Sequence, residues 1–179
     1  MTATTEKHEA FQYNDGGRSD AGLKGDTRDC VCRAISIASG RPYMEVYERL
    51  AEGNATQRRG KYESSYKAGK RTASRGINTK RKWFKDYMSE LGFTWTPTMG
   101  IGTGCKVHLV ADELPSGRLV VAVSKHYTAM IDGVIHDTHN PQREIHWTNT
   151  TYVDGERVVT HSIQRRCVYG YWKFQGGEA

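Results

Sequence analysis

The sequence Asp26-Thr27-Arg28-Asp29-Cys30-Val31-Cys32-Arg33-Ala34-Ile35 predicts a helix with a cysteine in its first turn. Its apolar residues continue at helical spacing to Ala38, and Gly40 supplies a stop. The residues that can cap its N-terminus are Asp26, Thr27 and Asp29. Unpaired backbone N–H groups and the helix dipole lower the pKa of a thiol at such a position, and the thiolate is the reactive form. Cys30 is therefore a candidate nucleophile, and a small core residue is the alternative for a lone cysteine there.

A second informative stretch, residues 118–137, predicts three antiparallel strands. An apolar strand leads into a turn that carries His126, a second strand and an Asp-Gly hairpin signal follow, and a third strand ends at Asp137. In such a hairpin the two side chains lie next to each other. A carboxylate there fixes the imidazole tautomer and leaves the other ring nitrogen free to take a proton from a thiol.

Cys30, His126 and Asp137 thus form an ordered set, with the nucleophile on a helix and its base and orienting carboxylate on a sheet. Cys32 is the runner-up nucleophile. Side chains two residues apart on a helix point about 200° apart, so only one of the two thiols can face His126. Asp132 competes with Asp137, but an Asp before a Gly in a tight turn is favoured for local backbone reasons.

The chain resembles the papain-like cysteine peptidase superfamily. It looks closest to the bacteriocin-processing (double-glycine leader) branch and to small phage-encoded relatives. Those proteins open their catalytic helix with Asp-Cys, as Asp29-Cys30 does here. Their catalytic His precedes an apolar strand, as His126 does, and an Asp closes the following strand, as Asp137 does. The resemblance spans roughly residues 25–140.

The phage relatives also have sequences similar to residues 29–35 and 132–137 of this chain. Two positions depart from the bacteriocin branch. That branch follows its Cys with Gly-Pro, where Val31-Cys32 stand here, and its upstream oxyanion Gln has no clear counterpart, since Gln12 is far from Cys30 in the sequence.

The resemblance implies a papain-like α+β fold, with N-terminal helices packed on a C-terminal antiparallel sheet. It implies a hydrolase that cleaves a peptide or isopeptide bond in a peptide or protein, without a cofactor; the same site could run amidation or transglutamination. Cys30 attacks the carbonyl, His126 acts as base and then acid, and Asp137 holds His126. The Cys30 backbone N–H and a second donor, for which Thr27 is the candidate, would meet the oxyanion. A catalytically idle papain-like domain that binds a host factor is the alternative.

Length and composition indicate a single soluble domain. The chain has 179 residues and no apolar run long enough for a membrane span or a signal peptide. We therefore expect a cytoplasmic protein, in the host cytoplasm if a phage encodes it, with no membrane partner. Four cysteines without regular spacing predict reduced thiols rather than a disulfide framework.

The organisation predicted from the sequence is a polar N-terminal arm, residues 1–24, followed by one papain-like domain, residues 25–179. Phe11 and Tyr13 could form an edge strand in an otherwise loose arm. Further helices are expected at residues 41–53, 80–91 (capped by Thr79) and 107–114. Further strands are expected at residues 93–98, 145–147, 151–153, 157–163 and 168–174.

A basic loop insertion is expected at about residues 57–82. This segment has ten Lys or Arg and one acid, Glu63, so its net charge is +9, whereas the whole chain carries +6. A basic loop with interleaved tyrosines can contact phosphates or an acidic partner, so a nucleic-acid-binding protein is a further alternative. A solvated insertion is equally compatible. The candidate binding residues are Arg58, Arg59, Lys70, Arg71, Lys80, Arg81 and Lys82.

Two other motifs give weaker evidence for a binding site, one for phosphate and one for a metal ion. The Gly-rich residues 99–104 lack the Lys-Ser/Thr ending of a phosphate-binding P-loop. His136, His139 and His146 cluster around Asp137, but no Cys pair of metal-binding spacing exists, and neighbouring strand residues point to opposite faces. We therefore predict no metal site.

Overall fold

A computed structural model describes residues 11–25, 27–56 and 72–176. Within them, three α-helices and two 3-10 turns lie in the order α1 (Cys30–Ser39), α2 (Tyr43–Ala55), η2 (Ala73–Arg75), α3 (Lys82–Glu90) and η3 (Ala111–Glu113). The strands are β1 (Phe11–Tyr13), β2 (Phe93–Pro97), β3 (Arg118–Val123), β4 (His126–Ile131), β5 (Val134–Asp137), β6 (Glu144–Val153), β7 (Glu156–Arg165) and β8 (Val168–Phe174). The α+β class is confirmed.

Six strands form one sheet in the order β1-β5-β4-β3-β8-β2, and β6 and β7 form a separate hairpin. Every neighbouring pair of the large sheet is antiparallel except β1 and β5, which are parallel. The sheet is therefore mixed, and the expectation of a purely antiparallel sheet is wrong. Parallel neighbours need a long connection, and the helices and three strands of the sheet lie between β1 and β5 in the sequence.

Both faces of the sheet are covered. Val120 and Ala129 pack with the helices in one hydrophobic core, whereas Leu119, Val121 and Met130 pack in a second core on the opposite face. Because strands buried on both sides read as continuous apolar runs, β3 shows no alternation of polar residues. The second core is closed by Leu109 and Leu114, which flank η3.

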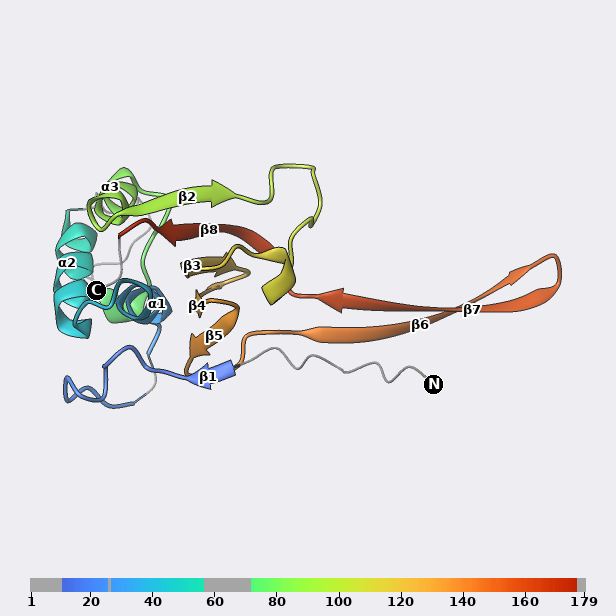
Figure 1. The fold of residues 1–179 in the computed structure, drawn as a ribbon, viewed down its shortest axis with the longest axis horizontal. Helices are drawn as coiled ribbons and strands as arrows, with labels where there is room; N and C mark the ends of the chain where they lie inside the picture. The colour runs from blue at the N-terminus through green and yellow to red at the C-terminus, as the bar shows by residue number, and fades with distance from the viewer. Residues whose placement is uncertain (1–10, 26, 57–71, 177–179) are drawn as a thin grey trace, which may run out of the picture.

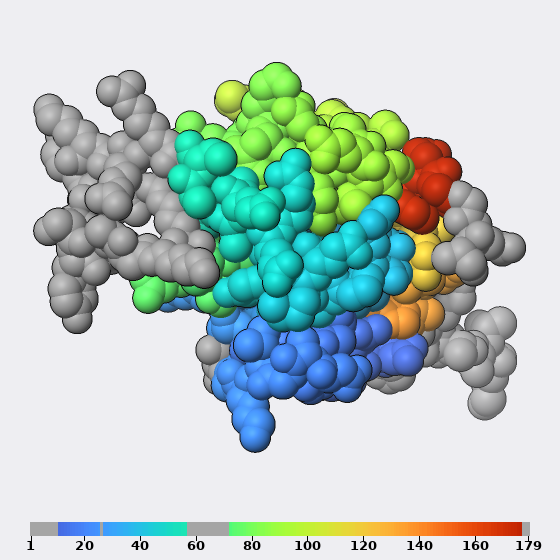
Figure 2. Space-filling model, turned by 90° about the vertical axis from the view of Figure 1, so that its left-hand side faces the viewer, coloured from blue at the N-terminus to red at the C-terminus, as the bar shows by residue number. Residues whose placement is uncertain are grey.

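The helices gather at one side of the sheet, and α1 contacts β3, β4 and β5 (Figure 1). Figure 2 shows α2 and α3 next to each other on this helical side of the molecule. The prediction for α1 is confirmed: it begins at Cys30 and ends before Gly40, which adopts a left-handed conformation at φ 73° and donates its N–H to Ser36 O.

Two other helix predictions need correction. The third helix begins at Lys82 with Arg81 as its N-cap, because residues 78–81 form a turn in which the Arg81 N–H donates to Asn78 O at 3.2 Å. The Thr79 hydroxyl accepts a hydrogen bond of 2.8 Å from the Tyr127 hydroxyl. Residues 107–114 form only the short turn η3. The carboxylate of Glu113 there accepts the His108 backbone N–H at 2.7 Å, an interaction that holds the chain in a turn.

Residues 11–24 are held against the domain rather than loose. The edge strand β1 pairs with β5, and the Arg18 guanidinium reaches the buried Asp29 at 3.1 Å. Residues 1–10 of the predicted arm lie outside the described part of the chain. No helix in the described residues has the length and apolar character needed to cross a bilayer.

The hairpin β6–β7 runs away from the sheet on the side opposite the helices (Figure 1). All ten residues of each strand are exposed, including Trp147 at 57% and Tyr152 at 73%. Its turn is the predicted Asp154-Gly155, with φ 52° and 84°, the conformation typical of two-residue hairpins. The hairpin is longer than the sequence predicts, since β6 joins two expected strands into one.

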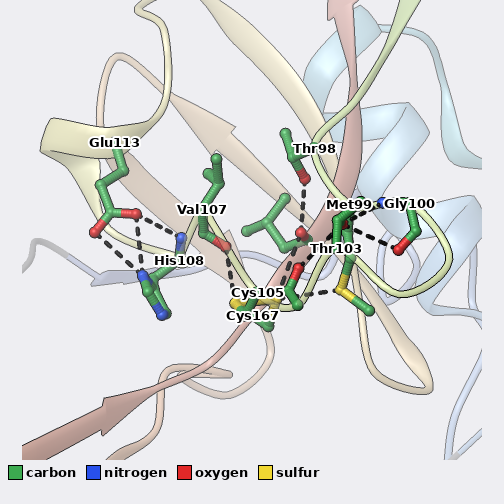
Figure 3. The surroundings of a disulfide bond; sticks show 11 residues. Thr98, Met99, Gly100, Thr103, Cys105, Val107, His108, Glu113 and Cys167 are labelled. Atoms are coloured by element: carbon green, nitrogen blue, oxygen red, sulfur yellow. Dashed lines mark hydrogen bonds and ion pairs between the residues drawn. A yellow bond between two sulfur atoms is a disulfide. The ribbon is translucent and has the colours of Figure 1, made fainter.

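Cys105 and Cys167 form a disulfide, so the expectation that all four thiols are reduced is wrong (Figure 3). The two cysteines are 62 residues apart in the sequence. Backbone hydrogen bonds from Leu109 N to Arg166 O and from Val168 N to Val107 O, both 2.8 Å, bring the two segments together. Sequence spacing carries no sign of this long-range pairing.

The disulfide gives a testable prediction. Replacing both Cys105 and Cys167 with Ser is expected to lower the free energy of unfolding by about 2–4 kcal/mol, because the link constrains the unfolded chain. Urea denaturation measures this change. As a control, thiol titration of the unfolded wild type should detect the two free cysteines, Cys30 and Cys32, before reduction and all four afterwards. Detection of four thiols without reductant would contradict the pairing.

Candidate active site

Cys30 is the first residue of α1 and is partly exposed. Backbone N–H groups in the first turn of a helix have no acceptor within the helix, so the Cys30 N–H is available to a ligand. The helix dipole adds positive potential at the same position. The sulfur therefore lies where a negative charge is stabilised.

Asp29 anchors this end of α1 in a way that the sequence does not reveal. Its carboxylate is fully buried and makes no capping bond to the helix. Oδ2 accepts a hydrogen bond of 2.5 Å from the Tyr43 hydroxyl and lies 3.1 Å from Arg18 Nε, while Oδ1 lies 3.3 Å from Arg33 Nε. Asp29 thus joins the N-terminal segment, α1 and α2 directly behind the cysteine.

Removing this carboxylate should be costly. Asp29→Ala is expected to lower the free energy of unfolding by about 3–5 kcal/mol, because it leaves the largely buried guanidinium groups of Arg18 and Arg33 without a counter-charge. Tyr43→Phe removes only one hydrogen bond and should cost about 1–2 kcal/mol. Urea denaturation of both variants tests the difference. Equal, small losses would show that Asp29 does not hold the segments together.

His126 and Asp137 meet across the neighbouring strands β4 and β5. His126 Nε2 lies 2.7 Å from Asp137 Oδ2, and the other carboxylate oxygen accepts the Thr138 backbone N–H at 2.7 Å. Asp137 is buried, with 4% of its surface exposed. The carboxylate therefore fixes one imidazole nitrogen and leaves Nδ1 as the nitrogen that can face Cys30.

The two titrating groups of the site favour their charged forms. Burial raises the pKa of Cys30, but the hydrogen bond to His126 and the charge of that ring outweigh burial and bring the pKa below its ordinary value. Burial lowers the pKa of His126, whereas hydrogen bonds to Asp137 and Cys30 raise it to about 9. The interaction between the two groups therefore favours the thiolate of Cys30 and the imidazolium of His126.

A pH titration tests the role of Asp137. In Asp137→Asn, the pKa of His126 should fall from about 9 toward its ordinary value of 6.5, because the neutral amide no longer stabilises the imidazolium by charge. The imidazolium should then be lost at lower pH than in the wild type. NMR titration of the imidazole carbon-bound protons measures the shift. His136→Gln is the matched control: it alters a neighbouring residue of β5 and should leave the His126 titration unchanged.

Cys32 and Asp132, the alternatives to Cys30 and Asp137, lie outside the candidate site. Cys32 is fully buried, and burial together with the Asp29 charge raises its pKa to about 12. Its Sγ donates to Tyr43 O at 3.7 Å. Asp132 occupies the β4–β5 turn, where its carboxylate accepts the Gly117 N–H at 2.8 Å. The structure therefore brings Cys30, His126 and Asp137 together and leaves Cys32 and Asp132 apart from them.

A cleft of about 1010 Å³ opens over Cys30 and His126. One wall consists of the start of α1 and the segment from Arg75 to Lys80. The aromatic lining of the cleft includes Trp95 on β2 and Tyr169 and Trp172 on β8. The β3–β4 turn, which carries Lys125, completes the rim. The cleft has the size of a ligand site for a peptide segment or a small molecule.

Thr27, the predicted second oxyanion donor, lines the cleft, but its hydroxyl already donates to Ser74 O at 2.9 Å. The Arg28 backbone N–H donates to the same carbonyl at 3.0 Å. Both bonds tie the segment before α1 to η2. Gln12 lies on β1 opposite His136 and does not line the cleft. Of the Thr27 hydroxyl, the Gln12 amide and the Cys30 backbone N–H, the last is therefore the donor placed to meet an oxyanion.

The predicted basic residues divide into three groups. Lys80 lines the cleft, whereas Arg81 caps α3 and Lys82 pairs with Asp86 at 2.8 Å. The others, Arg58, Arg59, Lys70 and Arg71, lie outside the described part of the chain. The structure adds cationic lining residues that the site prediction did not include: Arg28, Arg33, Arg75 and Lys125. Arg75 does fall within the expected basic segment.

His139 also belongs to this site. Its ring centroid lies 5.0 Å from that of His126, and it lines the same cleft. His146 is on the exposed hairpin, 3.9 Å from Glu144. Within the residues that the structure describes, no group of three or more His, Cys, Asp or Glu side chains is arranged to hold a metal ion.

Comparisons of the chain with models of protein families, with curated proteins and with solved structures find no match. A functional assignment therefore depends on the geometry and chemistry of the Cys30 cleft.

Proposed function

We propose that the chain is a papain-like cysteine hydrolase that cleaves a peptide or isopeptide bond with Cys30, His126 and Asp137. The observation that carries this proposal is the continuous interaction from the Cys30 thiol through His126 to the buried Asp137, with Cys30 and His126 lining an open cleft. A structural cysteine would need neither an imidazole partner nor access to a ligand-sized space. The order Cys, His, Asp, with the thiol at a helix start and the other two groups on a sheet, also agrees with the resemblance to papain-like peptidases.

The geometry supports a two-stage reaction. The Cys30 thiolate attacks the carbonyl carbon, a C–S bond forms, and the Cys30 backbone N–H donates to the developing oxyanion. The His126 imidazolium gives a proton to the leaving nitrogen as the C–N bond breaks, which leaves a thioester and neutral His126. A water molecule then passes a proton to His126 and attacks the thioester. The C–S bond breaks, the acid leaves, and the thiolate–imidazolium pair is restored.

Asp137 acts through His126. Its 2.7 Å hydrogen bond orients the ring and stabilises the imidazolium that exists before attack and after deacylation. Because Asp137 is buried against the Thr138 N–H, it supports His126 without reaching the substrate.

An active-site probe tests the proposal. A peptide vinyl sulfone, incubated with the protein near pH 7, should add once per chain, and peptide mapping by mass spectrometry should place the adduct on Cys30. The buried Cys32 is the internal control and should stay unmodified in the folded protein. In a separate incubation, the untreated protein should yield new peptide termini from a mixture of proteome-derived peptides.

The same experiment distinguishes an idle papain-like binding module. Such a module would show neither selective Cys30 labelling nor new termini. The hydrolase proposal would be refuted if the probe alkylated Cys30 no faster than a free thiol and the peptide mixture stayed intact.

A further inference from the structure

The rim of the cleft carries a concentration of positive charge. Arg28, Arg75, Lys80 and Lys125 all line it and are exposed, and within the described residues none of them pairs with a carboxylate. No Asp or Glu belongs to the described lining of this cleft. A cleft lined by charges of one sign concentrates ligands of the opposite sign. The described lining contains no carboxylate that would weaken this effect.

A second hollow, of about 690 Å³, continues this pattern. It shares Lys125, His126 and His139 with the first cleft and is also lined by Arg143 and Arg166. A ligand that passes Cys30 can therefore extend over His126 into it. Its described lining also contains no Asp or Glu.

Arg143 and Arg166 line the same hollow, and at least one of them is fixed in place. The charge of Arg143 lowers the pKa of Arg166, after the larger effect of burial. The Arg166 guanidinium is fixed by backbone carbonyls, at 2.9 Å from Pro141 O and 2.7 Å from Ser124 O, and not by a carboxylate. Arg165, by contrast, pairs with Glu144 at 3.1 Å. Arg143 and Arg166 therefore both bring positive charge to the lining of this hollow, and Arg166 is held in place by two backbone carbonyls.

We propose that the two hollows select peptide segments with Asp or Glu near the cleaved bond. This specificity rests on the hydrolase function proposed above. The cations surround a thiolate whose chemistry requires an acyl carbon, which an acidic polypeptide supplies and a phosphodiester does not. The exposed rings of Trp95 and Tyr169 give the same cleft an apolar surface for the side chains between the acidic residues.

A pair of small reagents measures the charge effect at Cys30 without a known substrate. Iodoacetate is an anion and iodoacetamide is its neutral analogue, and both alkylate the same sulfur. The rate of alkylation of Cys30 by iodoacetate, divided by the rate with iodoacetamide, should fall about tenfold in the double variant Arg28→Glu/Lys80→Glu. The matched control, Lys85→Glu/Lys106→Glu, makes the same change in net charge outside both hollows and should leave the ratio unchanged.

Matched peptides measure the selectivity itself. A peptide that the protein cleaves in the proteome-derived mixture is synthesised in three versions, with Glu, Gln or Lys on either side of the bond. We expect kcat/KM to decrease in that order, with about a tenfold advantage of Glu over Gln that disappears in Arg28→Glu/Lys80→Glu. Increasing salt should reduce the advantage.

The outcomes separate the two proposals. Failure of Cys30 to react selectively with any electrophile, together with an intact peptide mixture, would refute the hydrolase function. Selective reaction and cleavage, with equal rates for the three peptides and an unchanged reagent ratio in the charge variant, would overturn only the acidic specificity. Salt-dependent binding of a single-stranded oligonucleotide that the charge variant loses, with equal peptide rates, would also overturn it and assign the cations to nucleic acid.

Discussion

Cys30→Ala is expected to reduce the kcat for peptide cleavage by about 10⁴-fold or more, because no other described thiol or hydroxyl is shown in contact with His126. The substrate is any peptide cleaved by the wild type in the proteome-derived mixture, and the measurement is the rate at which its new N-terminus forms. The variant should also lose the vinyl sulfone adduct. The free energy of unfolding should change little, since Cys30 is only partly buried.

Cys32→Ala is the matched control for this experiment. Cys32 lies two residues further along the same helix, but it is buried in the core and donates to Tyr43 O. Its replacement should lower stability by about 1 kcal/mol and leave kcat almost unchanged. Equal loss of activity in both variants would show that helix packing, and not a reactive Cys30, controls the reaction.

His126→Ala is expected to slow the alkylation of Cys30 by iodoacetamide about 100-fold at pH 7, because burial then raises the thiol pKa without an opposing imidazolium. The direction follows from the coupling of the two groups. The hydrogen bond and the charge of His126 are the largest of the causes that lower the thiol pKa, and His126 keeps its proton up to about pH 9. Rate measurements from pH 5 to 10 should show the variant reaching wild-type reactivity only in strong base.

His139→Ala is the control for the loss of a ring. His139 lies beside His126 at 5.0 Å between centroids, but it makes no hydrogen bond within the described part of the chain. Its removal should leave the alkylation profile of Cys30 close to that of the wild type. If iodoacetamide alkylated Cys30 of the His126→Ala variant at the wild-type rate at pH 7, that result would contradict the thiolate–imidazolium pair.

The part of the fold that local sequence patterns encode was predictable. Helix α1 has its apolar spacing and its terminal Gly40, and β4 and β5 have the Asp132-Gly133 turn between them. The hairpin register then places His126 next to Asp137. The candidate site was therefore visible in the sequence, because its base and carboxylate lie within one local motif.

What the sequence could not supply depends on contacts between distant segments. Asp29 looks like a helix cap, but Arg18 and Tyr43 surround it and convert it into a buried anchor. The Cys105–Cys167 disulfide needs the pairing of two chain segments that share no sequence pattern. The parallel edge strand β1 and the cations around the cleft likewise come from different parts of the chain.

The exposed β6–β7 hairpin has a consequence for where the sequence and length of this chain can vary. Its two roots, at Ile145 and at Gln164, lie in the wall of the hollow beside His126, whereas its remaining length contributes to neither hydrophobic core. New side chains or a different length at the tip would thus leave the packed interior untouched, whereas substitutions at the two roots would change the lining of that hollow.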